Sequence, residues 1–192
     1  MASFGHAPLI LASASPRRRD LLAQIGIVPA RIAPTDIDET RRKDESPRAL
    51  AERLAREKAV ACDADGFVLA ADTVVALGTR NLEKAENAAE AEAFLRLLSG
   101  RSHQCITGIA VKAPDGRLQS RTVLARVRMK RITDQEIAAY VASGEWQGKA
   151  GGYGIQGMAG AFVTHINGSY TTIVGLPLYE TKSLLEGMGC RG

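Results

Sequence analysis

Cysteine and histidine are scarce in this chain, and their scarcity argues against several kinds of site. The 192 residues include three cysteines, at positions 62, 105 and 190, without the paired spacing of a zinc or redox motif. Such cysteine usage is typical of a reducing cytoplasm, where we expect the protein to act. The three histidines are scattered as well, so no zinc site is predicted.

Long apolar runs and a strong net charge are also missing. No segment is long enough to span a bilayer, and the apolar run at residues 9–12 is too short for a signal peptide, so no membrane partner is expected. The net charge is a mild +4, and aromatic residues make up 5% of the chain. A small anionic ligand explains this balance better than a nucleic acid. Because no repeat or linker interrupts the chain, residues 1–192 are predicted to form a single domain.

The N-terminal segment predicts an anion-binding junction between a strand and a helix. The apolar residues 9–12 indicate a short buried strand, and Ser15-Pro16 indicates a helix start, with Ser15 as the cap. Free backbone N–H groups and the helix dipole attract anions at such a start. Arg17 and Arg18 stand beside it, although the same pattern also fits an ordinary capped helix with solvated arginines.

Carboxylates gather in the segment Thr35-Asp36-Ile37-Asp38-Glu39. Acids this close repel one another unless solvent or a cation screens them. A solvated acidic turn explains the cluster on its own. Beside a phosphate site, however, the same oxygen atoms are suitable ligands for magnesium.

A single carboxylate, Asp72, interrupts the most apolar segment, residues 67–77, which predicts a buried central strand. Burial of an unpaired carboxylate is unfavourable. Asp72 is therefore either a structural residue that caps a neighbouring loop or an acid of an active site. We favour the second interpretation and expect Asp72 and Thr73 at a strand end, where α/β proteins place their chemistry.

The other segments predict an α/β protein. Helices are expected at residues 46–61, 86–98 and 133–142 and from residue 177 onward. Strands are expected at residues 31–33, 103–112, 118–130 and 161–166, with the middle two forming a hairpin.

Glycine is concentrated at residues 148–160, where positions 152–157 formally match a dinucleotide-binding fingerprint. We reject that match because the segment opens no helix and precedes a strand. A glycine-dense loop that carries Tyr153 and Gln156 can instead lie close against a flat ligand such as a base.

Together these motifs resemble the Maf-like nucleotide pyrophosphatases. The matching segments run in order through essentially the whole chain: Ser13-x-Ser15-Pro16-Arg17-Arg18, Arg56-Glu57-Lys58-Ala59, Ala71-Asp72-Thr73-Val74-Val75, Leu82-Glu83-Lys84, Leu98-Ser99-Gly100, Gly152-Tyr153-Gly154-Ile155-Gln156-Gly157, Asn167-Gly168-Ser169-Tyr170 and Val174-Gly175-Leu176-Pro177-Leu178. One departure is visible, since the family usually has proline where Ala85 follows Lys84.

The resemblance implies a mixed central sheet flanked by helices, with two lobes around a cleft, similar to inosine-triphosphate pyrophosphatases. It also implies hydrolysis of a nucleoside triphosphate to the monophosphate and pyrophosphate with a divalent metal cation, Mg²⁺ or Mn²⁺. Such an activity would clean the nucleotide pool. Several members are dimers, so a homodimer is one expectation.

Site residues follow from the same resemblance. Asp72 corresponds to the catalytic acid, usually assigned as proton acceptor. Phosphate-binding residues would be Ser13, Arg18, Lys58 and Lys84, and metal ligands would be Glu39, Asp72 and Asp38. Whether Asp72 is a general base or a metal ligand stays open at this point.

Substrate choice within the family differs at three positions, and this chain resembles the dTTP and UTP subgroup through Arg17, Thr73 and Gln156. The 7-methyl-GTP subgroup has an aromatic residue in place of Arg17 and an acid in place of Gln156. A glutamine amide can accept from uracil N3–H and donate to a carbonyl, whereas a carboxylate suits the two donors of guanine. A dTTP/UTP pyrophosphatase is therefore expected.

Three alternatives stay open. The first is a 7-methyl-GTP-type pyrophosphatase of the same family. The second is a non-catalytic regulator of septum formation or cell-division arrest. The third is a nucleic-acid binder, suggested by the positive charge but supported by no motif.

Overall fold

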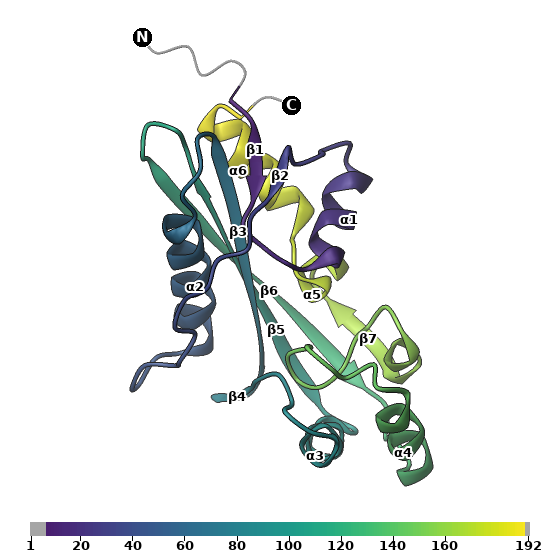
Figure 1. The fold of residues 1–192 in the computed structure, drawn as a ribbon. Helices are drawn as coiled ribbons and strands as arrows, with labels where there is room; N and C mark the ends of the chain where they lie inside the picture. The colour runs from purple at the N-terminus through teal and green to yellow at the C-terminus, as the bar shows by residue number, and fades with distance from the viewer. Residues whose placement is uncertain (1–6, 191–192) are drawn as a thin grey trace.

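The computed structural model describes residues 7–190 and contains a seven-stranded mixed sheet with helices on both faces (Figure 1). The strands are β1 (Leu9–Leu11), β2 (Arg31–Ile32), β3 (Phe67–Leu77), β4 (Arg80–Leu82), β5 (Ser102–Lys112), β6 (Leu118–Met129) and β7 (Val163–Asn167). Their order is β2-β1-β3-β5-β6-β7, and β4 pairs with β3 off this path. Strand β1 runs parallel to β2 and β3, whereas the other pairs are antiparallel, which confirms the expected mixed sheet and the β5–β6 hairpin.

The helices are α1 (Pro16–Gln24), α2 (Pro47–Ala61), α3 (Ala88–Leu98), α4 (Asp134–Ser143), the 3₁₀ helix η1 (Met158–Phe162), α5 (Tyr170–Val174) and α6 (Leu178–Met188). Proline occupies the first helical position of α1 and α2, where its missing N–H needs no partner. A capping box between Thr133 and Glu136 opens α4. Ser15 stands at the N-cap of α1 as predicted, but its side chain makes no capping bond. None of the helices within residues 7–190 has the length and apolar character needed to cross a membrane.

Helix α2 covers one face of the sheet, and α1, α5 and α6 cover the other (Figure 1). Successive side chains of a strand point to opposite faces, so β3 contributes to both layers. Val68 and Ala70 pack with α2, while Phe67, Leu69 and Ala71 pack with α1 and α6. A further cluster at the α3 and α4 end is built around the fully buried Tyr140.

The middle of β3 has one free edge. Strand β1 pairs with β3 as far as Leu69, and β4 pairs with it from Val75 onward. Residues 70–74 therefore lack a strand neighbour on this side in the described part of the chain, while β5 pairs along the other side. The hydrophobic clusters around Leu69 and Val75 lie on either side of the opening and form the two expected lobes.

Gly108 of β5 allows α2 to approach the sheet closely. A β-carbon there would lie 2.1 Å from the carbonyl oxygen of Ala51. We expect Gly108→Ala to lower the free energy of unfolding by about 1–3 kcal/mol, because the helix and the sheet must move apart. Urea unfolding measures the change. Gly187→Ala in α6 is the matched control, since a β-carbon there meets no atom within 4 Å and should cost no stability. Unchanged stability of Gly108→Ala would contradict the close contact.

Candidate active site

A cavity of about 630 Å³ opens at the free edge of β3. It is lined by all the sequence-predicted site residues except Asp38: Ser13, Arg17, Arg18, Glu39, Lys58, Asp72, Thr73, Lys84 and Gln156. These residues come from the β1–α1 junction, the loop before α2, α2 itself, β3, the segment after β4 and the glycine-rich loop. The fold thus collects residues from most of the chain at one opening.

Asp72 lies in the middle of β3, opposite Gly108 of β5, so the prediction that it stands at the end of its own strand is wrong. The strand that ends beside it is β1, whose last pair is Leu11 with Leu69. Asp72 and Thr73 point to opposite faces of β3, as neighbours in a strand do. Both reach the cavity because the free edge of β3 lets the cavity extend around the strand.

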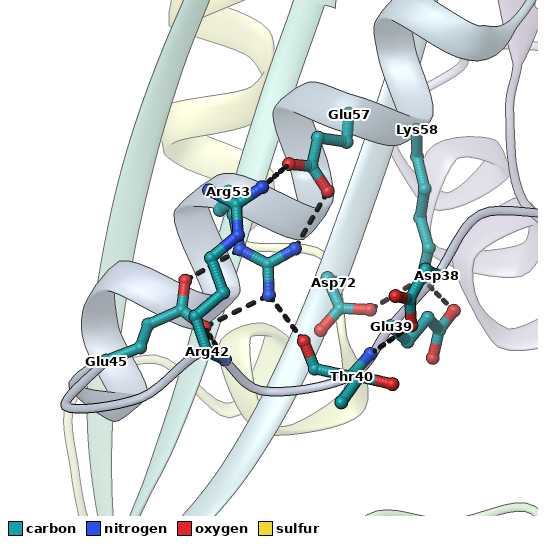
Figure 2. A network of polar contacts seen from close by, with 9 residues as sticks. All are labelled: Asp38, Glu39, Thr40, Arg42, Glu45, Arg53, Glu57, Lys58 and Asp72. Carbon is teal, nitrogen blue, oxygen red and sulfur yellow. Dashed lines mark hydrogen bonds and ion pairs between the residues drawn. The ribbon is translucent and has the colours of Figure 1, made fainter.

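On the α2 side of β3, Lys58 links two carboxylates (Figure 2). Its Nζ lies 2.7 Å from Asp72 Oδ1 and 2.6 Å from Glu39 Oε1. The side chains of Lys58 and Asp72 are 11% and 12% exposed, so this cation compensates the charge of Asp72 within an apolar strand. Burial would raise the pKa of Glu39, but the bond from Lys58 and the charges of Lys58 and Lys84 outweigh it and lower that pKa.

Lys84 extends this charged group toward solvent. Its Nζ lies 3.7 Å from Glu39 Oε2, and its side chain is 63% exposed. The next residue, Ala85, is buried in the cluster around Tyr140. Alanine in place of the usual proline therefore still leaves Lys84 at the cavity.

Arg18 approaches the cavity from the opposite face of β3 and is held by three hydrogen bonds. Nε donates to the carbonyl oxygen of Gly175 at 2.8 Å, Nη1 to Ser13 Oγ at 3.0 Å and Nη2 to Thr73 Oγ1 at 3.3 Å. Burial lowers the pKa of Arg18, while Asp72 raises it, and the guanidinium stays charged. Two of its five N–H donors remain for a ligand, and a guanidinium in this arrangement suits a phosphate.

Thr73 is placed by a chain of hydroxyl groups. Thr107 donates to the carbonyl oxygen of Thr172 at 2.8 Å, so its oxygen accepts from Thr73 at 2.9 Å. Thr73 in turn accepts from Arg18, and its hydroxyl therefore orients the guanidinium. Its role in substrate choice stays a prediction, and this geometry supports an action through Arg18.

Asp38 does not line the cavity, and its Oδ1 accepts from the Thr40 backbone N–H at 2.9 Å. No group of three His, Cys, Asp or Glu side chains that could hold a metal ion occurs within residues 7–190. Magnesium, however, is usually bound by one or two carboxylates together with water and substrate phosphates. Glu39 and Asp72, joined through Lys58, fit that pattern, whereas the predicted role of Asp38 as a ligand gains no support from its position.

The glycine-rich loop reaches the cavity because it is attached to the end of β4. The N–H of Gly151 donates to the carbonyl oxygens of Leu82 and Glu83 at 2.9 and 3.0 Å. A β-carbon at Gly151 would lie 2.8 Å from Val75 Cγ1, and the φ of +71° favours glycine. This attachment brings Gln156 to the same cavity as the residues that follow β4.

Tyr153 attaches the glycine-rich loop to the hydrophobic core. Its hydroxyl lies 2.7 Å from His103 Nε2 and its side chain is buried, so Tyr153 acts as an anchor within the core. Burial lowers the pKa of His103 to about 4, which keeps the imidazole neutral at pH 7.

Glu145 and Lys149 also line the cavity and were missed by the sequence analysis. Lys149 Nζ donates to the Glu145 carbonyl oxygen, and Glu145 Oε2 accepts from the Met158 N–H at 2.9 Å. Burial lowers the pKa of Lys149, and the charge of Arg17 acts in the same direction. The only available signal in the sequence was a lone lysine among glycines.

Comparison with known proteins shows a match of residues 8–188 to the family described as Maf-like protein. A dTTP/UTP pyrophosphatase from Hyphomonas neptunium is 80% identical over 188 residues, which cover 97% of this chain and 98% of the relative. A dTTP/UTP pyrophosphatase from Caulobacter vibrioides is 60% identical over 186 residues, which cover 95% and 96%.

Solved structures overlap with part of the fold. A nucleoside-triphosphatase / dITP/XTP pyrophosphatase from Mycobacterium abscessus has a TM-score of 0.40 and 18% identity, with 65% of this chain and 73% of that chain covered. A HAM1 protein from Coxiella burnetii has a TM-score of 0.45 and 18% identity, with 66% and 74% covered.

Arg18→Ala tests the anion site. We expect the affinity for a nucleoside triphosphate to fall by about 10- to 150-fold, the equivalent of a lost hydrogen bond between charged groups, while affinity for the bare nucleoside changes little. Calorimetric titration of both ligands measures the difference. Arg19→Ala is the matched control, because Arg19 lies on the same helix, is 61% exposed and does not line the cavity. Equal weakening of both ligands would show that Arg18 does not contact phosphate.

Proposed function

The chain belongs to the Maf-like protein family, and on that premise we propose that it hydrolyses dTTP and UTP to the monophosphate and pyrophosphate. The observation that carries the proposal is the 80% identity, over nearly the whole chain, to a dTTP/UTP pyrophosphatase. The convergence of Arg18, Lys58 and Asp72 at one cavity supports it, because this set can bind a polyphosphate beside a catalytic acid. By the same proposal, residues 1–192 act as one domain in the cytoplasm, and a homodimer stays a prediction.

We also propose a divalent metal, Mg²⁺ or Mn²⁺, as cofactor, with Glu39 and Asp72 as its protein ligands. The position of the two carboxylates supports this. Both approach the same Lys58 Nζ, and each bonds it through one of its two oxygen atoms, so oxygen lone pairs remain for a metal. When bound, the metal would neutralise charge on the polyphosphate.

The phosphate chain would be bound by cations on both sides of β3. Arg18 offers its two remaining N–H donors from one face, and Lys58 and Lys84 offer ammonium groups from the other. These three charges would stabilise the pyrophosphate as it leaves. The resemblance to the family implies that water attacks the α-phosphorus.

Asp72 would act on the attacking water. Its Oδ1 accepts from Lys58, which fixes the carboxylate and leaves Oδ2 to accept a hydrogen bond or a proton. The same oxygen also suits a metal, and the two roles are compatible with one position of the side chain.

Turnover of a panel of nucleoside triphosphates tests the proposal, with pyrophosphate and phosphate measured separately. We expect dTTP and UTP to release pyrophosphate, EDTA to abolish turnover and magnesium or manganese to restore it. Asp72→Asn should fold but lose about 100- to 10,000-fold in kcat, because a positioned acid or base contributes that much. Asp65→Asn, at an exposed carboxylate outside the cavity, should keep wild-type rates.

Several outcomes would contradict this proposal. Release of phosphate alone, full activity in EDTA or wild-type rates in a folded Asp72→Asn protein would each do so. A stable protein that turns over none of the triphosphates would favour the non-catalytic regulator, and preferred turnover of 7-methyl-GTP would favour the other subgroup.

Gln156→Glu tests the choice of base. Gln156 lines the cavity, and no hydrogen bond joins its side chain to the rest of residues 7–190, so its amide is available to a ligand. We expect kcat/KM for dTTP and UTP to fall together by about 5- to 150-fold, because one carbonyl of the base would face a carboxylate oxygen. GTP should lose less or gain. Gln147→Glu, at an exposed position outside the cavity, is the control. An unchanged ratio of UTP to GTP turnover would exclude Gln156 as a base-reading residue.

A further inference from the structure

Glu39 lies on a connection that has no regular structure of its own. Residues 33–46 join β2 to α2 without a helix or strand, and long segments of this kind in compact domains are often functional. Glu39 nevertheless reaches Lys58 Nζ at 2.6 Å. Something must therefore hold this connection against α2.

Arg53 of α2 makes that contact (Figure 2). Its Nε and Nη2 donate to Oε1 and Oε2 of Glu45 at 2.7 and 3.0 Å, as a two-point bond. Nη2 also donates to the carbonyl oxygen of Thr40 at 3.0 Å, and Nη1 to Glu57 Oε2 at 2.8 Å. One guanidinium thus binds the connection at Thr40 and at Glu45. Thr40 directly follows Glu39 in the sequence.

The pair of Arg53 and Glu45 is largely buried, with side-chain exposures of 12% and 8%. The bond from Arg53 holds the pKa of Glu45 at about 2, so the pair stays ionised at neutral pH. Neither residue lines the cavity. A buried ion pair is a poor source of net stability, and in some proteins it serves conformational specificity.

We propose that Arg53 is a positioning residue that holds the loop of residues 36–45 on α2, so that Glu39 meets Lys58. Helix α2 then contacts the loop at Thr40 and Glu45 through Arg53 and at Glu39 through Lys58. Arg53 acts through Glu39 and touches neither the phosphates nor the attacking water. This inference rests on the proposed function only for its activity measurements.

A double-substitution cycle separates positioning from general stabilisation. We expect Arg53→Lys to lower kcat/KM for UTP by about 10- to 100-fold, the scale of a small displacement of an active-site group. Glu39→Ala removes the side chain through which Arg53 acts. In that background, Arg53→Lys should change kcat/KM by less than about twofold. An equal loss in both backgrounds would overturn the proposal, because the effect would then not pass through Glu39.

Arg96→Lys is the matched control. Arg96 also bonds a glutamate four residues away on its helix, Glu92, and a second carboxylate, Asp134, but lies outside the cavity. We expect its replacement to leave turnover of UTP unchanged.

Hydrogen exchange tests the same proposal without activity. Arg53→Lys should accelerate exchange of backbone amides in residues 36–45 by about tenfold or more, while α2 and β3 keep their protection. Glu45→Gln keeps the shape of the partner but removes its charge, and it serves if Arg53→Lys fails to fold. Unchanged exchange in this loop in either folded variant would overturn the proposal. If the wild-type protein hydrolyses no triphosphate, the proposed function fails and the exchange measurement alone decides the role of Arg53.

Discussion

The site depends on the ammonium group of Lys58, which compensates two carboxylates from different parts of the chain. Asp72 stands in the middle of an otherwise apolar strand, where an unpaired charge would be strongly unfavourable. Helix α2 can supply the cation because its backbone lies directly over Gly108, the residue paired with Asp72. A side chain at Gly108 would push away the helix that neutralises the acid. The close packing of α2 on Gly108 is therefore also the condition under which Lys58 can compensate the charge of Asp72.

The free edge of β3 explains how adjacent residues of a strand share a cavity while pointing to opposite faces. Where a strand has neighbours on both sides, its side chains point into two layers that the sheet keeps apart. Here β1 stops at Leu69 and β4 starts at Val75, so the cavity extends around the intervening segment. The α2 side then presents the carboxylates and Lys58, while the α1 side presents Arg18. A polyphosphate bound across the edge would meet cations from both sides.

Regular patterns in the sequence were sufficient to predict the long elements, whereas tertiary contacts decide most of the remainder. The apolar run of β3 and the capping box of α4 are local signals, and both elements lie where they were predicted. Strand β4 and helix α5 were missed because segments of three and five residues carry no usable periodicity. The mid-strand position of Asp72 depends on where β1 and β4 end, which no feature of β3 itself encodes. Likewise, Glu39 lines the cavity and its neighbour Asp38 does not, and the contacts that distinguish them, from Lys58 and Arg53, are tertiary and leave no local pattern in the sequence.

Unused bonding capacity separates the residues that serve a ligand from those that serve the scaffold. Arg53 uses four of its donor positions within the protein, on Glu45, Glu57 and Thr40, and its partner Glu45 is buried with it. Arg18 keeps two N–H groups, Asp72 keeps Oδ2, and Lys84 remains mostly exposed beside Glu39. The first group is almost fully bonded within the protein and fixes geometry. The second is held in place yet incompletely bonded, which is the condition a site needs in order to bind phosphate and water without first breaking its own contacts.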